Sequence, residues 1–168
     1  YGRTGEWFGF QHSGVVPDVV TMAKAMGNGF PVGACWAKMD VAAAFKPGDH
    51  GSTYSGTAIA TAVVSAVIDE MRRIDAPRLA RDKGASLTSK LSGIPGVSGV
   101  RGSGLLLAVE LAPGIDAKAV YVALLGRGVV TNAVTASALR LAPPLTVTDA
   151  EIDEAVAALA SVLQEFIS

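Results

Sequence analysis

The chain has 168 residues, half of them apolar, and a net formal charge of −1. That length suffices for one ordinary domain or for two small lobes with a hydrophobic core. A near-neutral charge with no basic block argues against a nucleic-acid partner, and the sequence has no apolar run of about 18 residues that would predict a membrane span.

The order of apolar patterns along the chain predicts an α/β protein. Strand-like apolar runs occupy residues 15–23, 32–37, 104–111 and 129–131, and helical patterns occupy residues 57–73, 77–92, 116–127 and 149–167. The last helix has the clearest signals, because Thr148 and Glu151 have capping-box spacing and an apolar stripe follows them. A bend at residues 93–96 divides the chain into two lobes, an arrangement that suits a ligand-binding cleft.

Cys35 is the only cysteine, so no internal disulfide can form. It lies in the apolar run 32–37, and free cysteine is among the most buried residue types, so we expect a buried strand residue. A chain without disulfides is typical of a reducing, cytoplasmic setting.

Lys24 is the most informative single residue. It follows the apolar, partly β-branched residues 19–23, which predict a buried strand, and it precedes a loop with Gly27 and Gly29, where backbone can approach a ligand closely. Burial disfavours the ammonium form, and a lysine in that position is nucleophilic and can form a Schiff base with a carbonyl cofactor. The alternative is an ordinary exposed lysine at the start of a surface loop.

Three other polar residues have two interpretations each. Ser52 and Thr53 precede the predicted helix 57–73, so they either hold an anion near its N-terminus or form an ordinary capping loop. Arg140 lies in an apolar, strand-like stretch before a Pro-Pro pair. It either faces solvent on an edge strand or clamps a carboxylate through its planar guanidinium.

Two other kinds of site are not expected. His12 and His50 lack a second ligand at metal-binding spacing, so we expect no metal site. The glycine-rich stretches 27–32 and 102–107 lack the third glycine of a dinucleotide fingerprint, and no Walker-type Gly-Lys-Ser/Thr occurs.

Four segments resemble, in the same order, those of the class III aminotransferases, which are pyridoxal-phosphate enzymes of fold type I. The segments are GRTG at 2–5, PDVVTMAKAMGNGFPVGA at 17–34, HGSTYSG at 50–56 and LRLAPPL at 139–145. The chain departs from the usual family pattern at a few positions. Ala25 and Asn28 replace usual glycines, and Ser55, Thr57 and Ala58 replace the usual Gly, Asn and Pro.

The resemblance implies the C-terminal part of a fold-type-I transferase. Residues 1–75 would be the C-terminal part of the large cofactor-binding domain, residues 76–95 a connecting helix and turn, and residues 96–168 a small α+β C-terminal domain. In the family, an aspartate in an Asp-Glu-Val-Gln run just before the segment that Tyr1 begins pairs with the pyridine nitrogen. The family's stacking aromatic and its Gly-Thr phosphate loop also lie upstream. We therefore expect that this chain is part of a longer enzyme of about 400 residues, which is too large for a single hydrophobic core. We also expect that this chain alone is inactive.

The resemblance also implies roles for single residues. Pyridoxal 5'-phosphate would be the cofactor, with Lys24 holding its aldehyde and moving the proton. Thr53 and Ser52 would contact the cofactor, and Ser52 also the substrate. Arg140 would bind the substrate carboxylate. In the family, the loop at 50–56 reaches the partner subunit's cofactor, which implies a homodimer with a shared active site.

The reaction implied is amino transfer between N-acetylornithine and 2-oxoglutarate, a step of arginine biosynthesis. Ornithine, succinylornithine and 4-aminobutyrate are alternative amino donors within the same family. Two alternatives of other classes stay open. One is a pyridoxal enzyme that does not transaminate, such as an aminomutase or decarboxylase, and the other is a cofactor-free binding or dimerisation module.

Overall fold

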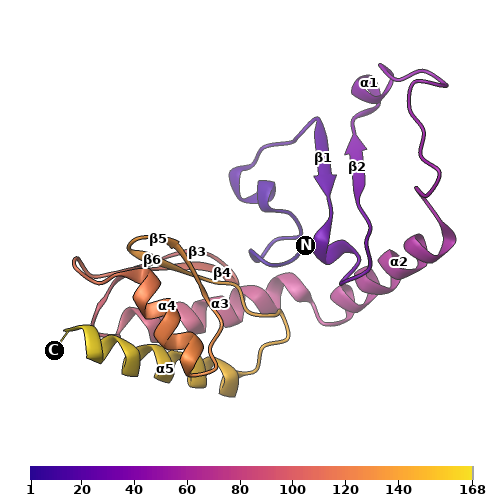
Figure 1. Ribbon diagram of the computed structural model, residues 1–168. Coiled ribbons are helices and arrows are strands. Elements are labelled where there is room, and N and C mark those ends of the chain that lie inside the picture. Colours follow the sequence, from indigo (N-terminus) through magenta and orange to yellow (C-terminus); the bar gives the residue numbers. More distant parts are fainter. Residues whose placement is uncertain (168) are drawn as a thin grey trace. The chain divides into compact units, whose positions relative to one another are not determined.

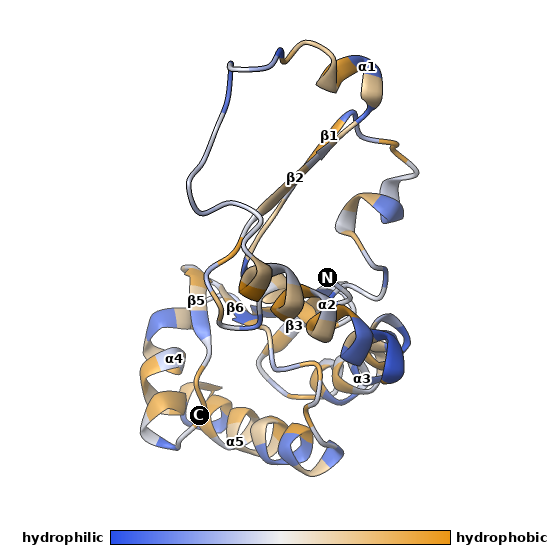
Figure 2. Ribbon diagram, turned by 90° about the vertical axis from the view of Figure 1, so that its right-hand side faces the viewer, coloured by the Kyte–Doolittle hydropathy of each residue, from blue (hydrophilic) through white to orange (hydrophobic). Residues whose placement is uncertain are grey.

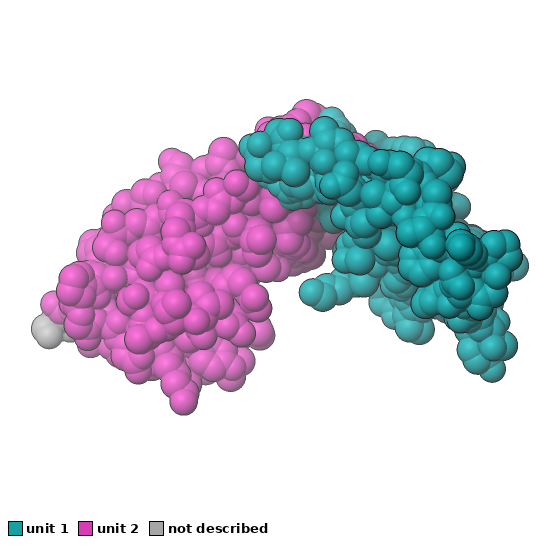
Figure 3. All heavy atoms as spheres, turned by 90° about the horizontal axis from the view of Figure 1, so that it is seen from above, with its two compact units in different colours: residues 1, 8–75 teal, residues 2–7, 76–168 magenta. Residues whose placement is uncertain are grey.

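The computed structural model describes residues 1–167, which form two compact units (Figure 3). Unit 1 comprises Tyr1 and Phe8–Asp75, and unit 2 comprises Gly2–Trp7 and, of the described residues, 76–167. The segment at 76–95, expected as a connector, thus lies within unit 2.

Unit 1 is built on a two-stranded antiparallel sheet and one long helix (Figure 1). Strand β1 (Val19–Met22) pairs with β2 (Ala34–Ala37), with Val20 opposite Trp36. The other elements of the unit are the short turns η1 (Gly9–Ser13) and η2 (Lys24–Met26), helix α1 (Met39–Ala42) and helix α2 (Ala58–Arg73).

The expectation of buried strands in this unit is wrong for the described residues. The strands carry mostly hydrophobic residues (Figure 2), yet Val19 is 47% and Trp36 48% exposed, and Cys35 is exposed as well. Two strands cannot cover their own faces, and burial requires other elements packed on them. The apolar run therefore predicted which residues form strands, but it did not predict whether other elements pack on them.

Unit 2 contains a four-stranded antiparallel sheet in the order β3-β4-β6-β5. Its strands are β3 (Val97–Ser103), β4 (Leu106–Leu111), β5 (Asn132–Thr135) and β6 (Ala138–Leu141). Strand β3 was not predicted, because its glycines interrupt the apolar pattern, and the strand expected at 129–131 begins three residues later as β5. Since β6 lies between β4 and β5, the edge-strand interpretation of Arg140 is wrong.

Three helices cover one face of this sheet (Figure 1). Helices α3 (Ala76–Ser92) and α4 (Ala117–Gly126) contact the strands, and α5 (Asp149–Ile167) packs against both helices. Val109, Leu139 and Leu163 are fully buried between these layers. The opposite face of the sheet carries Arg140, which is exposed.

The capping box of α5 is confirmed. The Thr148 N–H donates to Glu151 Oε2 at 2.7 Å, and the Glu151 N–H donates to Thr148 Oγ1 at 3.2 Å. These two bonds satisfy donors that the first turn of a helix otherwise leaves unpaired. Within residues 1–167, no helix has both the length and the apolar character needed to cross a bilayer.

Candidate functional site

Lys24 follows the end of β1 and begins the turn η2, where it is exposed. The burial expected for this lysine is therefore wrong for the described residues, because none of their elements covers it. Its φ is 55°, in the left-handed region that residues other than glycine rarely adopt. The turn is held by hydrogen bonds of 3.2 Å from Met26 N–H to Ala23 O and from Gly27 N–H to Lys24 O. The Lys24 amine forms no hydrogen bond or ion pair with any described residue, so it is available for a ligand. An uncommon backbone conformation beside an unpaired amine is a reason to suspect function.

The loop after Lys24 is packed tightly against itself. A Cβ atom on Gly27 would meet the Phe30 carbonyl oxygen and would lie 2.6 Å from Val32 Cγ1. A side chain at this position would therefore displace backbone, so the turn requires glycine. The loop that follows Lys24 thus has a fixed course.

Ser52 and Thr53 lie in an exposed loop before α2. Their hydroxyls make no hydrogen bond within the described part of the chain, and no backbone hydrogen bond pairs their amides. The N-cap residue Thr57 does not cap α2 with its side chain either. Free hydroxyls and amides in the loop that leads into a 16-residue helix form a donor set suited to an anion.

A hollow of about 470 Å³ in unit 1 brings part of this loop beside the segment after Lys24. Ser52 and Ser55 line it from one side, and residues 30–33 line it from the other. Lys24 and Thr53 are not among its lining residues. The structure therefore places Ser52 near the glycine loop but does not bring Lys24 and Thr53 together in this hollow.

Arg140 lies on β6 in unit 2, opposite Ala108 of β4 and Asn132 of β5. No described residue forms a hydrogen bond or ion pair with its guanidinium. Arg101, on the same row of the sheet, is instead paired with Glu110 at 2.6 Å. Arg140 therefore retains all its donors for a ligand on the open face of the sheet.

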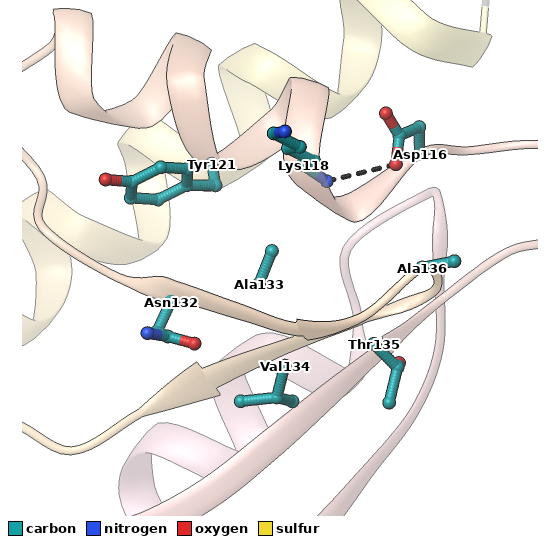
Figure 4. A pocket seen from close by; sticks show the side chains of 8 residues that line it. All are labelled: Asp116, Lys118, Tyr121, Asn132, Ala133, Val134, Thr135 and Ala136. Carbon is teal, nitrogen blue, oxygen red and sulfur yellow. Dashed lines mark hydrogen bonds between the residues drawn. The ribbon is translucent and has the colours of Figure 1, made fainter.

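A second hollow, of about 500 Å³, lies in unit 2 between the start of α4 and β5 (Figure 4). Lys118 and Tyr121 contribute from α4, and Asp116 accepts the Lys118 backbone N–H at 3.1 Å. Arg140 does not line this hollow. The carboxylate-binding role expected for Arg140 therefore does not depend on it.

Arg3 makes specific contacts that the sequence did not predict. Arg3 Nη1 donates to the Leu105 carbonyl at 3.1 Å and to the Pro143 carbonyl at 2.6 Å, and burial lowers the pKa of this guanidinium. The only sequence signal was its place in the GRTG motif, which does not indicate a partner.

The chain matches known proteins over nearly its whole length. Residues 1–163 match the family model for class-III aminotransferases. The acetylornithine aminotransferase of Corynebacterium efficiens is 45% identical over 164 residues, which are 98% of this chain and 40% of that protein. The acetylornithine aminotransferase of Bacillus subtilis is 41% identical over 162 residues, covering 94% of this chain and 41% of that protein.

Solved structures give the same result for the fold. The ornithine aminotransferase from Toxoplasma gondii is similar with a TM-score of 0.87 and 29% identity, covering 98% of this chain and 40% of that chain. The acetylornithine aminotransferase from Elizabethkingia anophelis is similar with a TM-score of 0.85 and 30% identity, covering 98% of this chain and 45% of that chain.

The chain spans about two-fifths of the length of the curated relatives it matches. The fold predicted from the sequence, an α/β C-terminal part of a fold-type-I transferase, is confirmed by these structures. By its match over residues 1–163 and the agreement of its fold, the chain belongs to the class-III aminotransferases.

Proposed function

We propose that this chain is the C-terminal part of a pyridoxal-phosphate-dependent enzyme that transfers an amino group between N-acetylornithine and 2-oxoglutarate. The observation that carries the proposal is Lys24, whose unpaired amine and left-handed backbone lie within the lysine segment of the family. The choice of N-acetylornithine is supported by relatives at 40–45% identity that are acetylornithine aminotransferases.

The residues present suit this cofactor by their chemistry. A lysine amine without a partner suits an aldehyde, and the free donors of Ser52 and Thr53 before α2 suit a phosphate. When bound, pyridoxal phosphate supplies an electron sink for the carbon that bears the reacting amine, which is Cδ in N-acetylornithine. Lys24 would hold the aldehyde, and Thr53 and Ser52 would hold the phosphate end.

The chain's own residues then have two tasks in the reaction. The released Lys24 Nζ would move a proton between the cofactor and the carbon that bears the reacting amine, as a positioned general base and acid. That carbon is Cδ in N-acetylornithine, whose α-amine is acetylated. In the second half-reaction Lys24 would move a proton in the opposite direction, onto the Cα that becomes that of glutamate. The Arg140 guanidinium binds a carboxylate through two parallel hydrogen bonds. Both N-acetylornithine and 2-oxoglutarate carry a carboxylate, so one arginine can serve both half-reactions.

The proposal includes partners that lie outside this chain. Because the relatives are more than twice as long as this chain, we propose that an N-terminal portion precedes it. We call the two together the complete enzyme. That portion would supply the carboxylate for the pyridine nitrogen. Unit 1 leaves large apolar side chains exposed, among them Val16 at 72% and Tyr54 at 85%, as expected of a surface that packs against further protein. A cytoplasmic homodimer with a shared active site completes the proposal.

An amino-donor profile of the complete enzyme tests this function. We expect the highest kcat/KM for N-acetylornithine when ornithine, succinylornithine and 4-aminobutyrate are compared with 2-oxoglutarate as acceptor. A higher kcat/KM for another donor would change the assigned substrate but would leave the assignment as an aminotransferase intact. Failure to form glutamate from any donor, with the cofactor absorbance band present, would instead indicate pyridoxal chemistry without transamination. A complete enzyme that takes up no pyridoxal phosphate would favour the binding module.

A further inference from the structure

The geometry points to Arg3 as a positioning residue for carboxylate binding, because it ties Pro143, just beyond the Arg140 strand, to the end of the neighbouring strand. The inference rests on the function proposed for Arg140. It concerns a residue that does not itself contact the substrate.

Arg3 contacts Leu105 through both its backbone and its side chain. The Leu105 N–H donates to the Arg3 carbonyl at 2.8 Å, and Arg3 Nη1 donates to the Leu105 carbonyl at 3.1 Å. Leu105 is fully buried at the turn before β4. The position of Arg3 is therefore coupled to the start of β4 at two points.

The same Nη1 atom reaches Pro143, and the register of the sheet explains why this contact matters. In the antiparallel pair β4–β6, Leu107 lies opposite Leu141 and Ala108 lies opposite Arg140. Continued by two residues, that register sets Leu105 opposite Pro143. Proline has no N–H, so the ladder cannot continue there with a backbone bond from Pro143. The Arg3 guanidinium joins the two carbonyls instead, at 3.1 and 2.6 Å.

The packing around Arg3 leaves little freedom for this segment. A Cβ atom on Gly104 would lie 2.5 Å from the Arg3 carbonyl oxygen, and one on Gly84 of α3 would meet the Gly104 carbonyl oxygen. Helix α3, the turn at Gly104 and the segment at Arg3 are thus in direct backbone contact. A rigid support of this kind is what a positioning residue requires.

Arg3 also lacks the ion pair that would explain it as an ordinary surface arginine. Among the described residues, no carboxylate pairs with its guanidinium, and its two bonds run to neutral carbonyls. Partial burial of a charged group is costly unless hydrogen bonds compensate for the lost hydration. Hydrogen bonds from a charged donor are stronger than those from a neutral donor. The net role of Arg3 is therefore to hold the chain just after Arg140.

Arg81 provides a matched control. It anchors the same N-terminal segment through the Gly5 carbonyl and through an ion pair of 3.6 Å with Glu6, but it has no contact with Pro143. General loosening of the segment would follow from Arg81→Met, whereas loss of the Pro143 contact would follow only from Arg3→Met.

The test uses steady-state kinetics of the complete enzyme with its cofactor. We expect Arg3→Met to raise KM for both N-acetylornithine and 2-oxoglutarate about tenfold, with kcat and the cofactor absorbance band unchanged. Arg3→Lys keeps one charged donor and should raise both KM values only about threefold. Arg81→Met should leave both KM values at the wild-type level.

Three results would overturn the inference. They are an unchanged KM in Arg3→Met, an equal rise of KM in Arg81→Met, and a fall in kcat without a rise in KM. If Arg3→Met does not fold, Arg3→Lys decides by the same criteria. Failure of the proposed function is recognised separately, because the wild-type enzyme would then form no glutamate from any of the amino donors. Failure of the role proposed for Arg140 is recognised by unchanged KM values in Arg140→Lys.

Discussion

At the scale of single residues, two positions after Lys24 differ in whether they require glycine. Asn28 replaces a usual glycine and has φ 45°, a left-handed conformation that asparagine tolerates better than most residues. Gly27, by contrast, has no room for a Cβ atom. The glycine that the packing requires is retained, and the one that is replaced stands where asparagine is acceptable.

Lys24 should be the lysine that carries the cofactor. After borohydride reduction of the complete enzyme with pyridoxal phosphate, peptide mapping should find the label on the peptide that contains Lys24, because its amine has no competing partner among the described residues. Lys38 serves as an internal control, since it is paired with Asp18 at 2.7 Å. A label on Lys38 or Lys46 in place of Lys24 would refute the assignment.

Arg140→Lys should raise KM for both the amino donor and 2-oxoglutarate about tenfold. Lysine keeps the positive charge but loses the planar fork that binds a carboxylate through two bonds. The absorbance of the bound cofactor should not change, because Arg140 has no proposed contact with it. Unaltered KM values for both substrates would mean that this arginine has another role.

At the scale of elements, local signals predicted what is local. Helix α5 was predicted correctly because its periodicity and capping box lie within the helix itself. Exposure of Cys35 was not predicted, because burial depends on which elements cover β2. The interior place of β6 depends on pairing with strands that are distant in sequence. Contacts between elements that are distant in sequence cannot be read from the local pattern of residues.

The same limit applies to the site. Lys24, Ser52, Thr53 and Arg140 could be proposed from the sequence because each lies in a short motif that resembles the family's. Arg3 could not be assigned a role, because its two partners lie 102 and 140 residues away. Contacts of that range become visible only in the folded chain.

Thr148→Ala should lower the free energy of unfolding of unit 2 by about 1 kcal/mol, the usual cost of losing a threonine N-cap. Urea unfolding of the chain, followed by circular dichroism, measures this change. Thr146→Ala is the matched control, since Thr146 is exposed and forms no hydrogen bond within residues 1–167. Equal effects of the two substitutions would mean that the cap does not stabilise α5.

The contribution of this cap should depend on pH. The Thr148 N–H, and then its hydroxyl, hold the pKa of Glu151 below its ordinary range. A carboxylate with a lowered pKa in the folded state stabilises fully above its unfolded pKa of about 4.3, and the effect is lost as the pH falls through the folded pKa. The difference between wild type and Thr148→Ala should therefore shrink below about pH 4.3. If the difference in the free energy of unfolding between wild type and Thr148→Ala stayed constant below about pH 4.3, the role of Glu151 would be contradicted.

At the scale of the whole chain, the two units differ in how far they bury their own apolar residues. The main buried cluster, which includes Leu107, Val120 and Leu159, lies in unit 2. Unit 1 has exposed strands instead. Amide exchange of the 168-residue chain should therefore be slow in β4 and β6 and fast in β1 and β2, as measured by NMR or mass spectrometry. Equal protection in both sheets would show that unit 1 is stable by itself.

The central claim is that this chain supplies the lysine, the phosphate donors and the carboxylate-binding arginine of an aminotransferase but not the whole active site. The most direct measurement compares glutamate formation by the 168-residue chain and by the complete enzyme. Each is given pyridoxal phosphate, N-acetylornithine and 2-oxoglutarate. Without a carboxylate partner for the pyridine nitrogen, the charge that develops at the carbon bearing the reacting amine would be poorly stabilised. We therefore expect turnover by the complete enzyme and only the free-cofactor background from the chain alone. Robust turnover by the chain alone, or none by the complete enzyme, would contradict the claim.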